Sequence, residues 1–296
     1  MLRFHPIRLV DRQMISDILR QYSPGSADYT FSNIYSWRAL FHTECDVIED
    51  TLVLRFVHNG VAGYMMPVGK KALDMFPLIF QDANERNRPF LMKGVTVAAR
   101  DIIEQAYPER FNFEHDRDND EYLYLSEQLV SLSGKGLQSK RNHINRFEAE
   151  YPDWEYVSVH SHTETRLCME MLRLWMRTLP PETAASRMYD YRAAHTMLRH
   201  FKYFGLSGGL IRVGKDIIAF SLGEPLNDST FVVHVEKAFS NIRGAYSLIN
   251  RQFAKHEAAG YTFINREEDM GLANIRKAKL SYRPVSMVEH FTVTLR

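Results

Sequence analysis

The 296-residue sequence contains only two cysteines, Cys45 and Cys168, which lie far apart in the chain. So sparse a pair offers no disulfide framework and is typical of a protein in a reducing compartment. No apolar run approaches the ~20 residues that a bilayer-spanning helix needs. The first residues also lack the charged, apolar and small-residue order of a signal peptide. We therefore expect a cytoplasmic protein without a transmembrane segment.

An excess of charge of either sign is also missing. Lysine and arginine together number 37 and aspartate and glutamate 36, which gives a formal net charge of +1. This balance excludes a broadly basic coat for nucleic acid and an acidic tail, but it leaves room for a local basic patch. Apolar residues make up 45% of the chain, so we expect a packed core rather than disorder.

Strand and helix patterns alternate along the chain. An Asn-Gly pair at 59–60 separates two β-type runs and predicts a hairpin over 51–69. A second hairpin is expected over 210–224. The remaining strands are predicted near 4–9, 89–95, 121–126, 154–161, 229–239, 261–265 and 285–295. Helices are predicted over 11–22, after Gly25, and over 70–86, 97–106, 126–150, 163–179, up to about 204, 244–260 and 270–280.

The order of these elements recurs in the two halves of the chain. Each half runs through hairpin strands, a helix, a strand, a helix and a strand, and such alternation implies an α/β sheet. We therefore predict two domains, 1–150 and 151–296, with the helix near 126–150 crossing from one sheet to the other. Functional sites in such folds tend to lie where strands end and helices begin.

The first candidate site is the segment 134–146, which carries four basic residues and no acidic one: Lys135, Lys140, Arg141 and Arg146. Gly134 and Gly136 stand at the expected helix start, where backbone N–H groups and the helix dipole attract anions. A solvated helix face would also account for any single lysine here. Four positive charges without a negative one are less usual for an exposed helix and indicate anion binding.

The second candidate is the segment 265–284, in which acids precede bases. Asp269 is predicted to cap a helix, so that Glu267 and Glu268 lie at its positive end. Helix electrostatics then explain the acids and Lys277. Arg276, Lys279 and Arg283 would share one face of the helix, with Leu272 and Ile275 turned to the core, and this basic face could clamp a phosphate or carboxylate.

The third candidate is the strand 229–239, where His234 and Glu236 fall on the same side. A buried Glu236 with a raised pKa would be a candidate general base, whereas a satisfied structural pair is an equal alternative. Four further polar or aromatic residues are assigned to the pocket: Tyr29, Asn33, Asn265 and Tyr282. Tyr29 and Asn33 lie four residues apart, a spacing that usually marks a core edge and less often a pocket wall.

Metal and nucleophile motifs are absent. His160 and His162 have no further ligand in a credible spacing, so no metal site is predicted. No G-x-S-x-G or G-x-G-x-x-G pattern occurs either.

Four segments together resemble a bacterial family grouped with the C-terminal domain of phosphatidylglycerol lysyltransferases. They are DYTFSNIYSW, YLYLSEQLVSLSGKGLQSKRNHINRF, VEKAFSNIRGAYSLINRQFA and INREEDMGLANIRKAKLSYRP. The resemblance spans nearly the whole chain. It implies two tandem GNAT-like acyltransferase domains of mixed α/β architecture.

The same resemblance implies an activity. The better-known relatives transfer an aminoacyl group from aminoacyl-tRNA to a phosphatidylglycerol hydroxyl, and their tails are most similar at Gly271, Leu272, Lys279 and Pro284. Arg276 and Lys279 would then contact the donor or an anionic acceptor. The acyl-CoA loop of ordinary GNAT enzymes, [QR]-x-x-G-x-[GA], is altered here, because Asn241 and Tyr246 occupy its first and last positions.

Three functions follow as hypotheses. The first is an aminoacyl- or acyltransferase that uses an aminoacyl-tRNA donor, with Glu236 or Glu268 as the base and a small molecule or lipid headgroup as the acceptor. Its donor phosphates would be held by a basic set: Lys135, Lys140, Arg141, Arg276 and Lys279. The second is an N-acyltransferase that uses acyl-CoA, and the third is a non-catalytic module that binds an anionic ligand. The sequence leaves the oligomeric state open.

Overall fold

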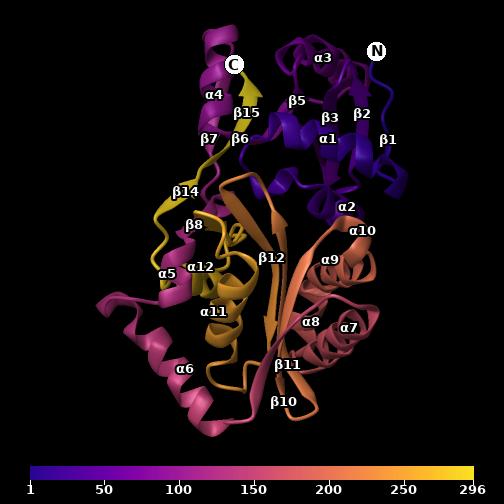
Figure 1. Ribbon diagram of the computed structural model, residues 1–296. Helices are drawn as coiled ribbons and strands as arrows, with labels where there is room; N and C mark the ends of the chain where they lie inside the picture. Colours follow the sequence, from indigo (N-terminus) through magenta and orange to yellow (C-terminus); the bar gives the residue numbers. More distant parts are fainter. The chain divides into compact units, whose positions relative to one another are not determined.

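A computed structural model describes residues 1–296 (Figure 1). Contacts divide the chain into two compact units. Unit 1 comprises Met1–Glu121, Glu268–Leu272 and Met287–Arg296, and unit 2 comprises Tyr122–Glu267 and Ala273–Ser286. The division into folding domains at residue 150 stays a prediction, because compactness alone does not show which segments fold independently.

The sheet of unit 1 has the strand order β1-β2-β3-β4-β6-β15-β7, with β5 paired to β3. All pairs are antiparallel except β4 with β6. Its strands are β1 (His5–Pro6), β2 (Glu44–Ile48), β3 (Thr51–His58), β4 (Val61–Met65), β5 (Val68–Gly69), β6 (Leu91–Thr96), β7 (Phe111–His115) and β15 (His290–Leu295).

Helices cover this sheet. They are α1 (Arg12–Tyr22), α2 (Phe31–Phe41), α3 (Phe76–Glu85) and α4 (Val97–Ala106), preceded by the short 3-10 turns η1 (Leu9–Asp11) and η2 (Ala27–Tyr29). Thr30 caps α2 and Thr96 caps α4, because each hydroxyl accepts a backbone N–H of the first turn. α1 packs on β3 and β5, and α4 packs on β6 and β15.

The second sheet has the order β14-β8-β13-β12-β11-β10-β9, with β12 and β13 parallel. Its strands are β8 (Glu121–Leu125), β9 (Trp154–Ser158), β10 (Ser207–Val213), β11 (Asp216–Pro225), β12 (Thr230–Ala238), β13 (Phe263–Asn265) and β14 (Ser286–Val288). Strand β11, next to the central strand β12, is buried through its middle six residues and open at its ends, which agrees with helices on both of its faces.

Those helices include α11 (Ala245–Glu257) on one face and α7 (His162–Arg177) on the other (Figure 1). The remaining helices of unit 2 are α5 (Ser126–Ser131), α6 (Gln138–Glu150), α8 (Pro181–Ser186), α9 (Met188–Arg199), α10 (Phe201–Phe204) and α12 (Ala273–Leu280). Ser161 begins α7 with a capping box that Glu164 completes. Every helix of the chain is too short or too polar to span a bilayer.

The predicted mixed α/β fold with two sheets is confirmed. The single helix predicted over 126–150 is wrong, because the chain breaks between α5 and α6. Leu132 and Gly134 adopt left-handed φ values of 51° and 81°, which end one helix before η5 (Lys135–Leu137) leads into the next. Strands β2 and β7 were not predicted.

Candidate functional site

The centre of the candidate site is the carboxylate of Glu236 on β12, which two groups clamp from different elements. Arg266 follows β13, the parallel neighbour of β12, and its Nη2 donates to Glu236 Oε1 over 2.9 Å. Asn250 lies on α11, and its Nδ2 donates to Glu236 Oε2 over 3.0 Å. Both oxygens of the predicted base are therefore engaged.

Each clamping group keeps a second polar atom without a hydrogen-bond partner. Arg266 Nη1 and Asn250 Oδ1 are both buried and unpaired. The side chain of Arg266 is only 10% exposed, so solvent does not compensate it. An unpaired buried donor or acceptor costs about 1–3 kcal/mol, which marks this pair as a place where a ligand could bind.

Aromatic rings surround the guanidinium. Its carbon lies 4.9 Å from the centroid of Tyr282 and 5.7 Å from that of Tyr124. Burial lowers the pKa of Arg266, but the charge of Glu236 and the two tyrosines outweigh it and leave the pKa raised. Arg266 is thus a permanent buried cation.

A second cation adjoins this cluster. Lys140, on α6, places its Nζ 4.0 Å from the centroid of the Tyr282 ring. Burial lowers the pKa of Lys140, and the charge of Arg266 lowers it further. Burial also raises the pKa of Tyr282 to about 12, although Arg266 opposes this. With one carboxylate for two cations, the cluster has an excess of positive charge and suits an anion or a developing oxyanion.

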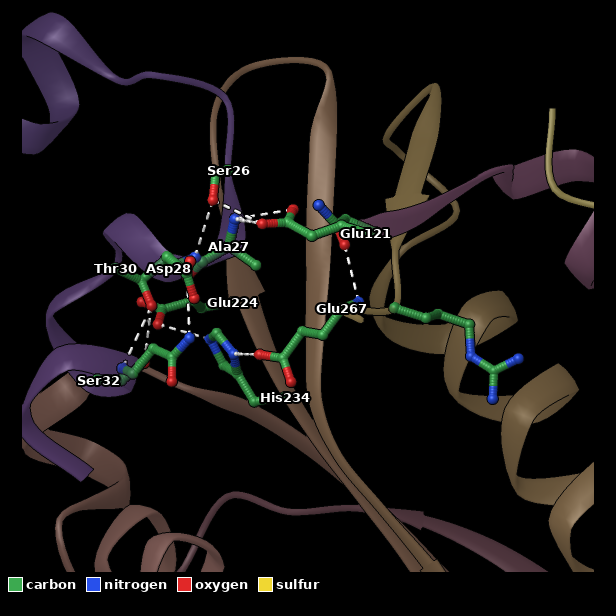
Figure 2. A network of polar contacts seen from close by, with 12 residues as sticks. Ser26, Ala27, Asp28, Thr30, Ser32, Glu121, Glu224, His234 and Glu267 are labelled. Carbon is green, nitrogen blue, oxygen red and sulfur yellow. Dashed lines mark hydrogen bonds and ion pairs between the residues drawn. The ribbon is translucent and has the colours of Figure 1, made fainter. Parts of the chain in front are cut away.

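His234, predicted beside Glu236, is bound in a separate network (Figure 2). Its Nδ1 lies 2.7 Å from Glu267 Oε1 and its Nε2 lies 2.9 Å from Glu224 Oε1. Burial lowers the pKa of His234, but these hydrogen bonds raise it to about 10. The imidazole is therefore a charged link between two carboxylates, which is a structural arrangement and leaves neither nitrogen for proton transfer.

A further buried acid lies in unit 1. Glu121 accepts from the hydroxyl of Ser26 over 2.5 Å and from the backbone N–H of Ala27 (Figure 2). Its Oε1 lies 3.2 Å from Nε2 of His290. Burial lowers the pKa of His290, but Glu121 raises it to about 9. The predicted base Glu268 is half-buried in the same unit, where its charge contributes to this rise.

The other predicted pocket residues have mainly local partners. Tyr29 is buried and donates to the carbonyl of Met66 over 3.1 Å, and the amide of Asn33 donates to that of Ala27 over 3.2 Å. Asn265 is buried at the end of β13, where its Oδ1 accepts the backbone N–H of Glu267 over 2.8 Å. Tyr29 and Asn33 belong to unit 1, whereas Asn265, His234 and Tyr282 belong to unit 2.

The residues of the predicted basic set do not share one environment. Arg141 donates from Nη1 to the carbonyl of Gly134 over 2.9 Å and so braces the break between α5 and α6. Lys279 donates from Nζ to the carbonyls of Arg266 and Glu267 over 2.5 and 2.9 Å. Lys135 is exposed and Arg276 is half-buried on α12. Two residues of this set lie at the Arg266 cluster. Lys140 contacts the Tyr282 ring, and Lys279 contacts the backbone carbonyl of Arg266.

Three details predicted for the segment 265–284 are wrong. Asp269 does not cap α12, which begins at Ala273. Instead, Asp269 is buried, accepts the N–H of Gly271 over 2.9 Å and lies 3.5 Å from Nη1 of Arg117. Leu272 is exposed rather than turned to the core. The helix ends at Leu280, and Arg283 adopts a φ of 57°, so Arg283 does not continue its basic face.

Sequence reasoning missed Arg266 and Asn250. Arg266 directly precedes the acids that were interpreted as helix-end charges, and Asn250 lies inside an otherwise ordinary helix. A signal was present, because Arg266 directly follows the strand predicted over 261–265, which is the next predicted strand along the chain after the one that carries Glu236. The pairing of those two strands had to be known before this proximity could be used.

Comparisons with known proteins agree with the fold. The family model described as phosphatidylglycerol lysyltransferase, C-terminal, matches residues 19–294. A protein of unknown function from Bacteroides thetaiotaomicron is 39% identical over 100% of both chains, with a TM-score of 0.93. L-PGS from Bacillus licheniformis is 15% identical over 96% of this chain and 91% of its own, with a TM-score of 0.62.

Two further relatives complete this set. The C-terminal domain of a proposed lysylphosphatidylglycerol synthetase from Agrobacterium fabrum is 12% identical over 96% of this chain and 92% of its own, with a TM-score of 0.67. An uncharacterised protein from Mycoplasmoides gallisepticum is 25% identical over 178 residues, which are 58% of this chain and 55% of that relative. The family model and these shared folds relate the chain to the C-terminal domains of phosphatidylglycerol lysyltransferases.

Proposed function

Since the chain belongs to the phosphatidylglycerol lysyltransferase C-terminal family, we propose that it transfers an aminoacyl group from an activated donor of the aminoacyl-tRNA type to an acceptor. One observation carries this proposal. Arg266 and Asn250 hold the same carboxylate, and each keeps a buried polar atom without a partner, one a donor and the other an acceptor.

An aminoacyl ester complements this pair of atoms. Its carbonyl oxygen accepts a hydrogen bond, which Arg266 Nη1 can donate. Its α-ammonium group donates hydrogen bonds, which Asn250 Oδ1 can accept next to the negative charge of Glu236. A simple acyl group offers a carbonyl but no donor, so it would leave Asn250 Oδ1 unpaired. The cluster therefore favours an aminoacyl over an acetyl donor.

The transfer needs an acceptor held next to the ester, a base, and positive charge to stabilise the oxyanion. A hydroxyl or amine of the acceptor attacks the ester carbonyl carbon and loses its proton to a base. The carbonyl electrons move to oxygen, and the tetrahedral oxyanion is stabilised by Arg266 and Lys140. The electron pair then returns, the bond to the ribose oxygen breaks, and the ribose hydroxyl leaves with a proton. Glu236 and Glu268 remain the proposed bases.

Access to the cluster requires movement of a side chain, because Arg266 Nη1 has no contact with solvent. Lys140 is half-buried above Tyr282 and has a long flexible stem. We propose that Lys140 swings away when the donor enters and then contacts it. The exposed Lys135, with Arg141, Arg276 and Lys279, remains the proposed set for the donor phosphates.

A transfer assay tests the proposal. Bulk tRNA charged with radiolabelled amino acids is incubated with the protein and an extract of bacterial lipids and small molecules, and label leaving the tRNA for the extract is counted. We expect transfer by the natural sequence and a loss of about 10²–10³-fold in Arg266→Ala. Arg251→Ala is the matched control, since this arginine lies on α11 and pairs with Glu148 outside the cluster.

Two outcomes would overturn the assignment. Failure of transfer with every extract, together with a rise in melting temperature on adding acetyl-CoA, would identify an acyl-CoA enzyme. Failure of transfer with every extract, together with binding of an anionic ligand that Arg276→Ala and Glu236→Ala weaken, would identify a non-catalytic binding module.

A further inference from the structure

Three metal-ligating side chains meet in unit 1, at positions far along the chain from Glu236, Asn250 and Arg266. Strand β1 pairs with β2 so that His5 lies opposite Cys45, and the Cys45 Sγ is 3.9 Å from His5 Nδ1 and 3.8 Å from Nε2. Asp11, in the turn η1, places its Oδ2 3.8 Å from His5 Nδ1. All three ligand atoms lie within 4.8 Å of one another.

We propose that His5, Asp11 and Cys45 bind one divalent transition ion of the zinc type. Thiolate, imidazole and carboxylate are the ligands zinc takes, and a thiolate disfavours magnesium and calcium. Zinc bonds of about 2.0–2.3 Å at tetrahedral angles place ligand atoms about 3.4–3.6 Å apart. The distances from His5 Nδ1 to Cys45 Sγ and to Asp11 Oδ2, 3.9 and 3.8 Å, exceed this range by only a few tenths of an ångström, and all three ligand atoms stay within 4.8 Å of one another.

The surroundings support three ligands and an open position. Asp11 and Cys45 are buried, whereas the His5 side chain is 36% exposed, so solvent reaches the cluster from the side of the imidazole. A water molecule can fill the fourth position there, as zinc sites with three protein ligands allow. His5 Nδ1 also lies 3.1 Å from the carbonyl of Pro6, a contact that binding through Nδ1 would replace.

Arg8, which is not one of the three proposed ligands, already orients the carboxylate of Asp11. The backbone N–H of Arg8 donates to Asp11 Oδ2 over 2.7 Å, and Arg8 Nη2 donates to Oδ1 over 3.0 Å. Such outer partners fix the direction of a ligand and are typical of built metal sites. The cationic side chain of Arg8 weakens the attraction for a metal ion, but it is largely exposed and free to turn towards water.

The other cluster of this kind, formed by Asp28, Glu121 and His290, fits a metal less well. Glu121 already accepts from Ser26 and Ala27 on the oxygen that faces His290. The ring of His290 has Glu121 near one nitrogen and Asp28 near the other, 3.9 Å from Nδ1. That arrangement suits an imidazolium ring held between two carboxylates. A metal ion would bind one ring nitrogen, and both carboxylates would have to lie on the side of that nitrogen.

A bound ion would act as a clip for the start of the chain. Strand β1 contains only two residues and is held by two paired positions. Linking His5 to Asp11 and Cys45 would tie β1, η1 and β2 together, and the binding free energy would add to the stability of this part of unit 1. The proposal is independent of the transfer chemistry.

Titration with metal tests it. The full chain is stripped with a chelator, dialysed, and titrated with zinc chloride by calorimetry and with cobalt(II) by absorption. We expect one equivalent of zinc to bind and cobalt to give a thiolate charge-transfer band. Cys45→Ser should abolish the band, and His5→Gln, at a half-exposed position, should weaken zinc binding at least 10-fold. Cys168→Ser, the matched control, removes the only other thiol and should retain both signals.

Three results of these titrations would contradict the zinc proposal. The proposal is wrong if the natural sequence binds no zinc at micromolar concentrations, or if Cys45→Ser keeps the cobalt band. Retention of full zinc affinity by His5→Gln would show that surface histidines bind the metal. Circular dichroism of each variant establishes that it is folded before the titration is compared.

Discussion

Arg266 illustrates, at the scale of a residue, how one side chain serves structure and remains available to a ligand. Its Nη2 pairs with Glu236, its planar face lies among tyrosine rings, and its Nη1 has no partner. Replacement by lysine would preserve the charge but not the two-pronged geometry, because an ammonium group is a point charge. The same logic applies to Asn250, whose amide has one end bound to Glu236 and the other unpaired.

His234 provides a prediction about pH. Its folded-state pKa of about 10 exceeds the ordinary value of 6.5 because Glu224 and Glu267 bind the charged ring. Its contribution to the free energy of unfolding is therefore fully present below about pH 6.5 and is lost as pH rises towards 10. We expect His234→Gln to remove a stabilisation of a few kcal/mol at pH 6.5 and much less at pH 10.

Urea unfolding at pH 6.5, 8 and 10 measures this dependence. His160→Gln is the control, because His160 is exposed and should leave the pH profile unchanged. An equal loss of stability at all three pH values in His234→Gln would show that packing, rather than the charge, is what His234 contributes.

At the scale of elements, the sequence predicted the features that depend on neighbouring residues alone, such as tight turns. The hairpin at Asn59 and Gly60 formed because both residues adopt the left-handed φ that its turn requires. Strands β2 and β7 were missed because their sequences, ECDVI and FNFEH, mix acids with apolar residues and gain their structure from neighbouring strands. The break after α5 was missed because Leu132, a good helix former, takes a left-handed φ there.

The turn that begins α11 yields a prediction for an element. Gly244 has a φ of +95°, and a Cβ placed on it would lie 2.4 Å from the carbonyl oxygen of His143 on α6. Gly244→Ala should therefore destabilise the fold by at least about 2 kcal/mol, through both backbone strain and the clash. The loss would displace the first turn of α11 and with it Asn250.

Thermal unfolding checks this estimate against Gly260→Ala. A Cβ at Gly260 meets nothing within 4 Å and its backbone needs no left-handed φ, so that variant should stay within about 0.5 kcal/mol of the natural sequence. A similar melting temperature for the two variants would contradict the packing of this turn on α6.

At the scale of the molecule, the fold class and the family could be predicted from the sequence, whereas the side-chain contacts within the site could not. The resemblance in four segments led to two α/β sheets, and the structure bears this out. The contacts of Glu236 could not be read from the sequence, because Asn250 and Arg266 lie 14 and 30 residues away from it and meet it only through sheet pairing and helix docking. The proposed metal ligands His5, Asp11 and Cys45 were missed for the same reason, because they lie on separate elements.

The distribution of charge predicts how tRNA should bind. The net charge is only +1, so affinity would come from local basic residues. If about four phosphates are contacted, raising salt from about 50 to 200 mM should weaken binding on the order of 10²-fold. Lys135→Ala should lower the slope of log K against log salt by about 0.7–0.9, while the exposed Lys215→Ala should not. Filter binding across a salt series measures both slopes, and a slope that Lys135→Ala leaves unchanged would remove Lys135 from the donor site.

The central claim is that Asn250 and Arg266 receive a free aminoacyl group, and one ratio of affinities tests it most directly. Binding of bulk aminoacyl-tRNA is compared with binding of the same tRNA after acetylation of the α-amino group. A charge-assisted hydrogen bond of about 1.5–3 kcal/mol predicts a preference of about 10–100-fold for the free amine. Asn250→Ala should abolish this preference, whereas Gln252→Ala, a buried amide on another face of α11, should keep it. Equal affinity of the natural sequence for the two forms would contradict the account.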